Sequence, residues 1–511
     1  MGDGQGLSEQ RDIRPQAEVP GFLLSRWLFL RLLGVVYLAA FLSLWVQVDG
    51  LIGSRGILPV GEYLTAVEQV TGPQRFYLAP TLCWLDASDP FLHELCAGGV
   101  VLSGLLILGV APAPVLFLLW VIYLSLNVAG QVFLIYQWDA LLLETGFLAV
   151  FLAPPQLWPR LGHEAPPSRV VLWLFRWLLF RLVFGSGVVK LLSGDPTWGN
   201  LTALRYHYET QPLPAWTSWY MHQLPGWFQG LSVLLTFVAE LVVPVGIFGP
   251  RRWRYAACAG IVGLQVLIAA TGNYGFFNLL TVVLCVPLLE DGFFPARWRA
   301  RLAADEESAV ASRRRAWPGW LLAPLAAGIL ILSVMPYLHQ RGLVARWPAW
   351  LAQTYRAAAA FSSVNSYGLF AVMTTQRHEI VVEGSDDGRT WLAYEFKWKP
   401  GDVNRRPGFT GLHMPRLDWQ MWFAALTRDC RESPWFIAFL GRLLEGSPEV
   451  LALLDKNPFP DRPPRYIRAV RYDYHFTGAA WRAEPGAWWR RRPLRLYCPI
   501  VSRRDQAVPD Q

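Results

Sequence analysis

Five charged residues lie inside long apolar stretches of the sequence, where an ionised side chain is costly. They are Glu144, Arg176, Arg181, Lys190 and Glu240. A charge at the centre of a lipid bilayer costs roughly 2.5–3.5 kcal/mol on insertion scales, so each group needs a partner or a route to the membrane surface. A buried lysine can also serve as a general base, because desolvation lowers its pKa. The set could therefore form buried ion pairs or carry out proton transfer.

The spacing of these charges limits which of them can meet. Arg176 and Arg181 are five residues apart, so their side chains point about 140° apart on a helix. Arg176 and Lys190 lie toward the two ends of one stretch, and we expect them to extend toward opposite membrane interfaces. Arg181 and Glu240 lie nearest to mid-depth, and Glu144 would be drawn into a bundle. The pattern predicts a buried pair of Arg181 with either Glu240 or Glu144.

Two polar segments adjoin these charges. Asp139 stands near the expected start of a helix, where a carboxylate can accept from free amides and interacts favourably with the helix dipole. A later loop, rich in aromatic and hydrogen-bonding groups, contains His207 and Glu209. These two could act as acid and base, although a loop histidine with satisfied hydrogen bonds is the simpler interpretation.

Several kinds of enzyme and metal site are disfavoured because their motifs are missing. The sequence has no nucleophile elbow, phosphate-binding loop or HExxH helix. None of the six cysteines forms a CxxC pair, so no metal site is expected. Cys83 with Cys96, and Cys430 with Cys498, could form disulfides if they face an oxidising compartment.

The composition requires lipid as part of the solvent. Of the 511 residues 53% are hydrophobic and only 16% are charged, well below the roughly 25% of an ordinary soluble domain. The 26 tryptophans fit anchoring at the two membrane interfaces. Arginines in cytoplasmic loops explain the net charge of +8, and no motif supports a nucleic-acid partner.

Nine apolar stretches could span a bilayer, whose core needs about 20 helical residues. The second, fourth and eighth are short, and such helices can be tilted, re-entrant or buried inside a bundle. The stretches are 27–47, 97–111, 113–131, 140–154, 169–192, 229–249, 255–271, 275–289 and 319–337. The sequence therefore predicts a polytopic α-helical membrane bundle of about nine spans.

Loop charges orient this bundle, because arginine and lysine favour cytoplasmic loops. An odd number of spans with the amino terminus inside satisfies the rule at every large loop. The arginines then assigned to the larger cytoplasmic loops are Arg160, Arg251, Arg252, Arg254, Arg297, Arg299, Arg301, Arg313, Arg314 and Arg315, against Arg55, Arg75 and Arg205 outside. The predicted parts are a cytoplasmic tail (1–26), a bundle (27–337) with extracytoplasmic loops 48–96 and 193–228 and cytoplasmic loop 290–318, and an extracytoplasmic domain (340–511).

From about Gln340 the composition becomes that of a soluble domain. A β-branched segment, a turn cluster and an alternating segment follow one another, which predicts a hairpin with a longer loop. Expected strands are 379–383, 391–398 and 466–476, and expected helices are 417–427 and 434–454. The domain is therefore predicted to be β-rich with mixed α/β content.

Collinear motifs along the chain carry a resemblance to a known family. They include QWDALLLE (137–144), FGSGVVKL (184–191), TGNYGFFN (271–278), NSYGLF (365–370) and PRLDWQMWF (415–423). From about residue 25 to 500 the chain resembles the lipase maturation factor family. The candidate functional residues, taken from these motifs and from the charges inside apolar stretches, are Gln137, Trp138, Asp139, Glu144, Arg181, Lys190, Trp198, Arg205, His207, Asn273, Tyr274, Asn278, Asn365, Arg416, Asp418 and Trp419.

The resemblance implies a membrane protein that helps exported proteins to fold and assemble, as the family does for secreted lipases in animals. It implies the endoplasmic reticulum membrane in a eukaryote, or the cytoplasmic membrane in a bacterium, with the C-terminal domain lumenal or periplasmic. The implied partners are membrane lipid and an exported client such as a secreted lipase, and no cofactor is implied. The excess of arginine over lysine fits a GC-rich, bacterial genome, and the final residues 509–511 are no retention signal of the KDEL kind.

Two other functions use the same intramembrane charges. The bundle also distantly resembles the transmembrane family that includes the vitamin K-dependent carboxylase. This implies a membrane enzyme with a lipid-soluble or quinone-like cofactor, in which Lys190, Glu144 and Arg181 would be catalytic. A transporter would also need buried charges, but no inverted repeat is apparent. A maturation factor that binds its client, without covalent chemistry, is the main hypothesis.

Overall fold

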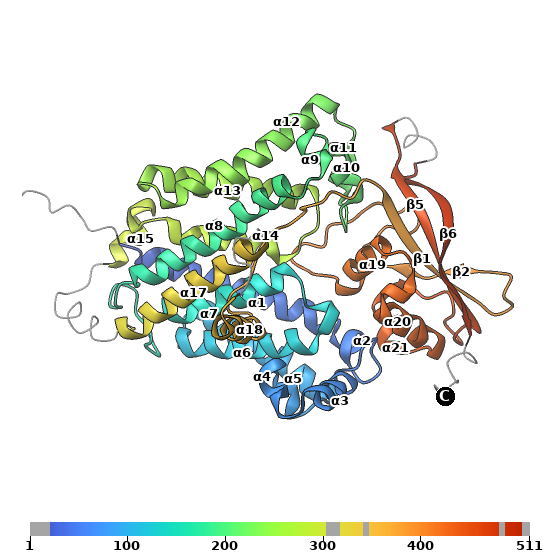
Figure 1. The fold of residues 1–511 in the computed structure, drawn as a ribbon, viewed down its shortest axis with the longest axis horizontal. Coiled ribbons are helices and arrows are strands. Elements are labelled where there is room, and N and C mark those ends of the chain that lie inside the picture. The colour runs from blue at the N-terminus through green and yellow to red at the C-terminus, as the bar shows by residue number, and fades with distance from the viewer. Residues whose placement is uncertain (1–20, 303–316, 341–346, 480–485, 503–511) are drawn as a thin grey trace, which may run out of the picture.

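The computed structural model describes residues 21–302, 317–340, 347–479 and 486–502. A helical bundle forms the larger part, and an antiparallel sheet with its own helices stands at one end of it (Figure 1). Most of the predicted tail 1–26 and the centre of the predicted loop 290–318, including Arg313, Arg314 and Arg315, lie outside the described residues.

Seven helical stretches in these ranges are long and apolar enough to cross a membrane. Such helices suit lipid, because every backbone polar group is satisfied within the helix. They are α1 (Leu23–Trp45), α5 (Asp89–Leu108), α6 (Pro112–Ala129), α8 (Arg169–Leu192), the stretch Gly226–Phe248 that begins with α12 (Gly226–Phe237), α13 (Arg251–Thr271) and α17 (Gly319–Gln340). With the shorter α7 (Gln137–Leu152) and α14 (Phe276–Cys285), each of the nine predicted stretches contains a helix, and the polytopic helical bundle is confirmed.

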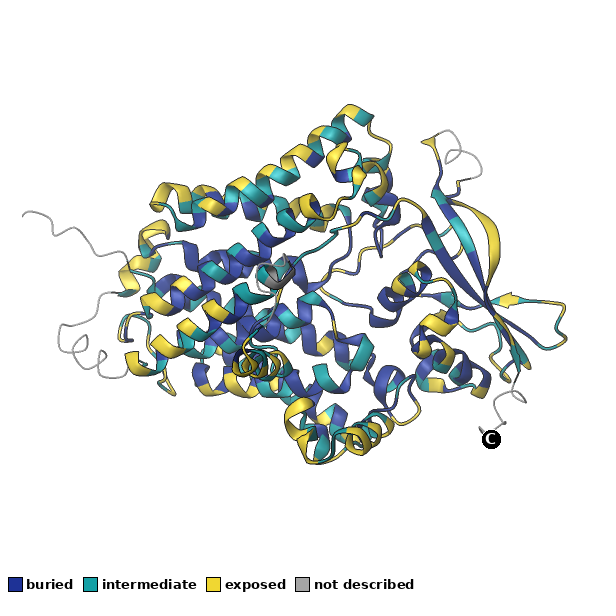
Figure 2. Cartoon of the chain, in the orientation of Figure 1, coloured by how far each residue is buried: buried dark blue, intermediate teal, exposed yellow. Residues whose placement is uncertain are grey.

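The two short helices lie inside the bundle. α7 and α14 contact each other and both contact α1 and α8, and most of their residues are buried (Figure 2). A helix surrounded by other helices does not have to match the thickness of the bilayer by itself. Of the arrangements expected for short stretches, burial within the bundle is therefore the one adopted here. The remaining short stretch, 97–111, belongs to a helix that is longer than expected, because α5 begins at Asp89.

The stretch that begins with α12 changes its helical geometry halfway. It passes into a π-helical turn, η4 (Val238–Val242), and then into a 3-10 segment, η5 (Val243–Phe248). Pro244 has no N–H to donate to the carbonyl of Glu240 four residues earlier, so a regular α-helix cannot continue here. Glu240 therefore lies in an irregular turn at mid-span, a kind of turn that is frequent at functional sites.

Short helices fill the connections between the spanning stretches. The α-helices are α2 (Val48–Ile52), α3 (Val60–Thr71), α4 (Arg75–Leu78), α9 (Pro196–Gly199), α10 (Ala203–Thr210), α11 (Trp216–His222), α15 (Ala296–Arg299) and α18 (Ala349–Ala360). The 3-10 turns are η1 (Gly72–Gln74), η2 (Leu82–Trp84), η3 (Gln131–Phe133), η6 (Val286–Leu288), η7 (Asp291–Phe293) and η8 (Ala300–Leu302).

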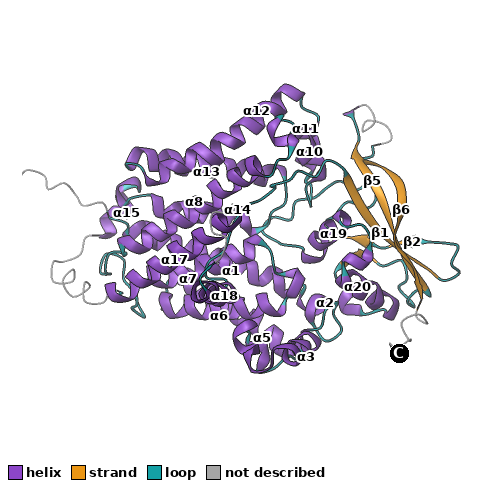
Figure 3. Cartoon of the chain, viewed as in Figure 1, coloured by secondary structure: helices purple, strands orange, loops and turns teal. Residues whose placement is uncertain are grey.

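The C-terminal part contains a four-stranded antiparallel sheet in the order β2-β1-β5-β6. Its strands are β1 (Arg377–Ser385), β2 (Leu392–Ala393), β5 (Tyr466–Phe476) and β6 (Trp489–Ser502), and β3 (Glu395–Phe396) pairs separately with β4 (Leu454–Lys456). The helices α19 (Arg416–Leu426), α20 (Pro434–Glu445) and α21 (Pro448–Leu451) lie between this sheet and the bundle (Figure 3). The predicted β-rich domain with helical additions is thus confirmed.

Three local predictions for this domain need comment. The hairpin is confirmed, because Glu383 of β1 pairs with Ala393 of β2. The expected strand 391–398 is divided, since β2 and β3 pair with different partners. The expected helix 434–454 was too long: α20 ends where Gly446 takes a left-handed conformation with φ of 74°, and Pro448 begins a new turn.

The long edge strand β6 was not expected from the sequence. It contains three consecutive arginines, Arg490 to Arg492, and two prolines, Pro493 and Pro499, which are unusual inside a strand. Proline is tolerated at the edge of a sheet, where its missing N–H faces outward. A disulfide joins Cys430 of the 3-10 turn η9 (Cys430–Glu432) to Cys498 of β6. The other possible pairing, Cys83 with Cys96, is not formed, and both are buried thiols.

One apolar core runs from the bundle into the C-terminal domain. Leu142 of α7 and Phe133 of η3 belong to the same buried cluster as Met414 and Phe436. The ring of Phe133 meets that of Trp435 in α20 edge to face, with centroids 5.9 Å apart. The two parts therefore share their hydrophobic stabilisation.

Candidate functional site

The deepest contact between the two parts is an ion pair of Arg416 with Asp139. Arg416 Nη1 lies 2.6 Å from Asp139 Oδ2, and Nη2 lies 2.8 Å from Oδ1. Tyr123 also donates to this carboxylate, at 2.6 Å. The two side chains are 1% and 0% exposed. This bidentate geometry is the strongest that arginine offers to a carboxylate, and it fixes α19 onto the start of α7. Asp139 lies in the first turn of α7, as expected, but its carboxylate binds Arg416 and Tyr123 rather than free amides of the helix.

The second contact is the pair of Arg181 with Glu144, which is one of the two pairings the sequence predicted. Glu144 Oε2 also accepts from the hydroxyl of Tyr367 at 2.7 Å and from the backbone N–H of Asn365 at 3.0 Å. Arg181 Nη1 donates to the Asn365 carbonyl at 2.7 Å. The segment that enters the C-terminal domain is therefore tied directly to the charges of α7 and α8.

Amide and indole groups add further ties between the bundle and the C-terminal part. Gln137 exchanges two hydrogen bonds of 3.2 Å with the backbone of Gly368. Trp198 donates its indole N–H to the carbonyl of Phe370 at 3.0 Å. Asn273 accepts from the N–H of Thr410 at 2.8 Å and donates to other loop carbonyls. These side chains replace the backbone partners that an irregular buried segment lacks.

Aromatic packing completes the junction. Trp138 and Trp419 meet edge to face with centroids 4.7 Å apart, and Tyr274 meets Trp419 at 5.9 Å. Asp418 on the same helix accepts from the backbone N–H groups of Trp398 and Lys399, each at 2.8 Å, and so orders the domain internally. Burial raises the pKa of Asp418 despite these hydrogen bonds.

The remaining charges form a third pair beside a cavity. Lys190 Nζ lies 2.8 Å from both carboxylate oxygens of Glu240 and donates to the carbonyl of Ser186 at 3.2 Å. Lys190 is 4% exposed, so the expectation that it extends to the membrane interface was wrong. The alternative pairing of Glu240 with Arg181 was also wrong, because Glu240 pairs with Lys190. These contacts engage all three donors of the ammonium group. Arg176 lies over the rings of Phe22 and Trp173 near the opposite end of α8.

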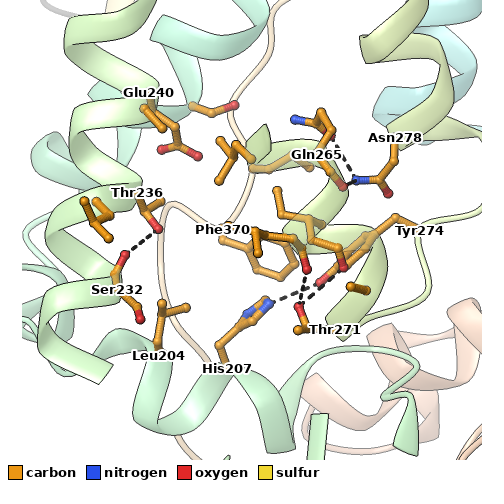
Figure 4. Close-up of a pocket in the computed structure, with 18 of the residues that line it drawn as sticks. Leu204, His207, Ser232, Thr236, Glu240, Gln265, Thr271, Tyr274, Asn278 and Phe370 are labelled. Carbon is orange, nitrogen blue, oxygen red and sulfur yellow. Dashed lines mark hydrogen bonds between the residues drawn. The ribbon is translucent and has the colours of Figure 1, made fainter. Parts of the chain in front are cut away.

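The cavity has a volume of about 880 Å³. It lies between α8, α12, α13 and α14, with the segment around Phe370 as one wall (Figure 4). Besides Lys190 and Glu240, its polar lining includes His207, Tyr274 and Asn278. Candidate residues from four distant segments of the sequence therefore meet here.

His207 points into the cavity, while Glu209 points away from it. The His207 Nε2 atom lies 3.3 Å from the hydroxyl of Tyr274. Burial, together with the positive charge of Lys190, lowers the pKa of His207 to about 4. Glu209 instead accepts from the backbone of Phe476 in β5. The two are not brought together as acid and base, which favours the simpler interpretation of a loop histidine, here hydrogen-bonded to Tyr274 outside the loop.

The three residues of the enzyme hypothesis are likewise divided. Arg181 and Glu144 belong to the junction, whereas Lys190 belongs to the cavity. Within the described residues, no three His, Cys, Asp or Glu side chains gather as a metal site. Arg205 joins neither cluster: it is exposed and lies against Gly226.

Several important residues were not singled out from the sequence. Gln47 accepts from the N–H of Arg416 at 2.8 Å, and Arg26 forms a buried pair with Glu164. Arg377 of β1 donates to Glu379 at 2.6 Å and to the carbonyl of Pro212 at 3.0 Å, so it joins the sheet to the loop after α10. Arg26 could have been found from its place at the start of an apolar stretch. Arg377 had no such signal, because it follows ordinary soluble-domain sequence.

The fold and junction define a class: a polytopic membrane protein whose extramembrane domain is fixed to the bundle by buried ion pairs. Residues 24–296 match the lipase maturation factor transmembrane domain, and residues 363–499 match the lipase maturation factor C-terminal domain. The chain belongs to the lipase maturation factor family.

Individual relatives agree with this assignment. Lipase maturation factor 2 of Gallus gallus is 38% identical over 93% of this chain and 81% of its own length. Lipase maturation factor 2 of Homo sapiens is 37% identical over 96% and 84%, and lipase maturation factor 1 of Bos taurus is 37% identical over 95% and 90%. No solved structure matches the chain.

Proposed function

We propose that this protein binds partly folded exported proteins at the membrane and assists their folding or assembly, with secreted lipases as the client class. The observation that carries the proposal is the match of both parts of the chain to the family, together with relatives named as lipase maturation factors. Binding rather than covalent chemistry accounts for the buried charges, which hold the C-terminal domain in place.

The C-terminal domain faces the lumen of the endoplasmic reticulum in a eukaryote, or the periplasm in a bacterium. Support comes from the arginine-rich segment around α15, which lies at the opposite end of the bundle from the sheet (Figure 1). Arginine clusters mark the cytoplasmic side of membrane proteins. The disulfide between Cys430 and Cys498 also suits an oxidising compartment.

The client binds along β6, the outer strand of the sheet. An edge strand offers unpaired backbone groups to an extended segment of another chain. Leu494, Leu496 and Ile500 on this strand are 42%, 50% and 50% exposed, and arginines lie beside them. Pro493 and Pro499 lack an N–H and so limit continuous strand pairing along this edge, with a client or with a second copy, which makes the exposed apolar side chains the main contacts. The strand therefore combines apolar contacts for unfolded segments with protection against aggregation.

The test is crosslinking capture of a secreted lipase during its synthesis, in cells that express the full-length protein. Leu494→Ser with Leu496→Ser should lower capture roughly tenfold or more, because two half-exposed leucines would no longer be buried by the client. The matched control is Leu392→Ser on β2 at the other edge of the sheet, where the leucine is 45% exposed. Equal capture by the double variant and the control would refute this surface. Failure of the unaltered protein to capture the lipase would refute the client class.

A further inference from the structure

The 880 Å³ cavity opens sideways toward the surrounding lipid. Leu235 of α12 and Leu267 of α13 both line it, yet they are 57% and 65% exposed. α13 is the least buried of the seven spanning stretches, and the stretch of α12 is among the next least buried. The mouth therefore lies between two helices on the side of the bundle that faces the bilayer, where the solvent is lipid rather than water.

Most of the cavity wall is apolar. Residues from α8, α12, α13 and α14 form it, among them Leu182, Phe228, Leu264, Ile268 and Phe277. Gly263 on α13 leaves room along one side, because a Cβ atom added there would meet nothing within 4 Å. The volume falls within the range of about 300–1,000 Å³ that is typical of small-molecule sites. A long hydrocarbon chain suits such a wall.

Hydrogen-bonding groups gather in one part of this wall. Asn278 Nδ2 donates to Gln265 Oε1 at 2.9 Å, and Tyr274 lies beside them with its hydroxyl between His207 and Gln211 (Figure 4). Figure 4 shows the amide nitrogen of Gln265 directed away from Asn278. Within the described ranges, that nitrogen donates to no other residue. It is a donor that a ligand oxygen can satisfy.

The charges that line the cavity cancel. Lys190 and Glu240 neutralise each other at 2.8 Å, and all three ammonium donors are engaged. Burial keeps the pKa of His207 at about 4, so its ring is neutral at pH 7. A buried phosphate or carboxylate would need a cationic partner that this lining does not hold. The site thus suits a polar group without charge.

We propose that this cavity binds an uncharged lipid with one long hydrocarbon chain, which enters from the bilayer between α12 and α13. Its hydroxyl or carbonyl end accepts from Gln265 and lies near Tyr274 and Asn278, while its chain lies along α12 and α13. This site is independent of the client surface on β6, because it lies within the bundle.

The experiment uses the full-length protein in phosphatidylcholine nanodiscs with a diazirine-bearing hexadecanol as probe. Photolysis should label peptides within 226–281, and unlabelled hexadecanol in excess should suppress that labelling at least fivefold. A diazirine-bearing hexadecyl phosphate should label the same peptides at least fivefold less. Labelling spread evenly over the bundle would overturn the site, and equal labelling by the phosphate would overturn its preference for uncharged lipids.

A cavity-filling variant provides the second measurement. Gly263 lines the cavity and is exposed, so Gly263→Leu places a side chain in open space at the mouth, between α12 and α13. It should obstruct entry and reduce hexadecanol labelling at least fivefold while the protein stays folded. Gly104→Leu on α5 is the matched control, because a Cβ there also meets nothing within 4 Å and Gly104 lies outside the cavity. If both variants are labelled as strongly as the unaltered protein, the assignment of the lipid to this cavity is wrong. Tryptophan fluorescence melting confirms that both variants are folded.

Discussion

Replacing Arg416 with methionine should destabilise the protein strongly. The change would leave Asp139 buried at 0% exposure with Tyr123 as its remaining side-chain donor. Two charge-assisted hydrogen bonds of 2.6 and 2.8 Å would be lost. Removing one partner of a buried pair costs about 3–5 kcal/mol, because the other charge stays desolvated. We expect the apparent melting midpoint, measured by tryptophan fluorescence in nanodiscs, to fall by roughly 10 °C.

The double variant separates the charge effect from lost packing. Asp139→Leu alone should cost a similar amount, since the guanidinium of Arg416 would be left unpaired. Combining it with Arg416→Met removes both charges, so the double variant should be more stable than either single one. Arg428→Met, at an exposed arginine just after α19, should change the midpoint little. Additive losses in the double variant, or a native midpoint in Arg416→Met, would refute the reasoning.

Two further predictions concern two buried histidines and the disulfide. Burial holds the pKa values of His207 and His413 at about 4, below the ordinary value of 6.5. The unfolded chain therefore binds more protons between these values, and stability should fall as pH decreases from about 7 to 4. The melting midpoint should depend less on pH in His207→Phe than in the unaltered protein. A midpoint that stays constant across this pH range in the unaltered protein would contradict the lowered pKa values. Reduction of the disulfide between Cys430 and Cys498, which are 68 residues apart, should lower the free energy of unfolding by about 2–4 kcal/mol. The melting midpoint with and without reductant measures this loss. Cys430→Ser should have the same midpoint as the reduced protein.

The bundle was predictable because its signal is local. Long apolar stretches need no knowledge of their neighbours to be assigned as helices in lipid. The charges within them were only partly predictable. Depth along a helix showed that Arg181 needs a partner, but the choice between Glu144 and Glu240 depends on which helices are neighbours. In the structure Glu240, which lies in the irregular turn Val238–Val242, pairs with Lys190 instead.

In the C-terminal domain, too, features with a local sequence signal were predictable and features that depend on distant partners were not. The hairpin followed from β-branched residues beside a turn cluster. β6 did not, because Arg490 to Arg492 and two prolines oppose strand formation, and pairing with β5 overrides that local preference. The resemblance marked Arg416 and Asp139 as functional candidates without joining them. No local pattern links two residues that lie 277 positions apart.

That separation has a consequence for the biosynthesis of the protein. The carboxylate of Asp139 is synthesised long before the guanidinium that neutralises it. At about 5–20 residues per second, the ribosome needs roughly 15 to 55 s to pass from one to the other. During this interval α7 has Tyr123 within reach but no cation from α19. A chain that terminates before α19 keeps the Asp139 carboxylate without its arginine partner. Incomplete chains therefore differ from finished ones by an unpaired acid at the end of the bundle.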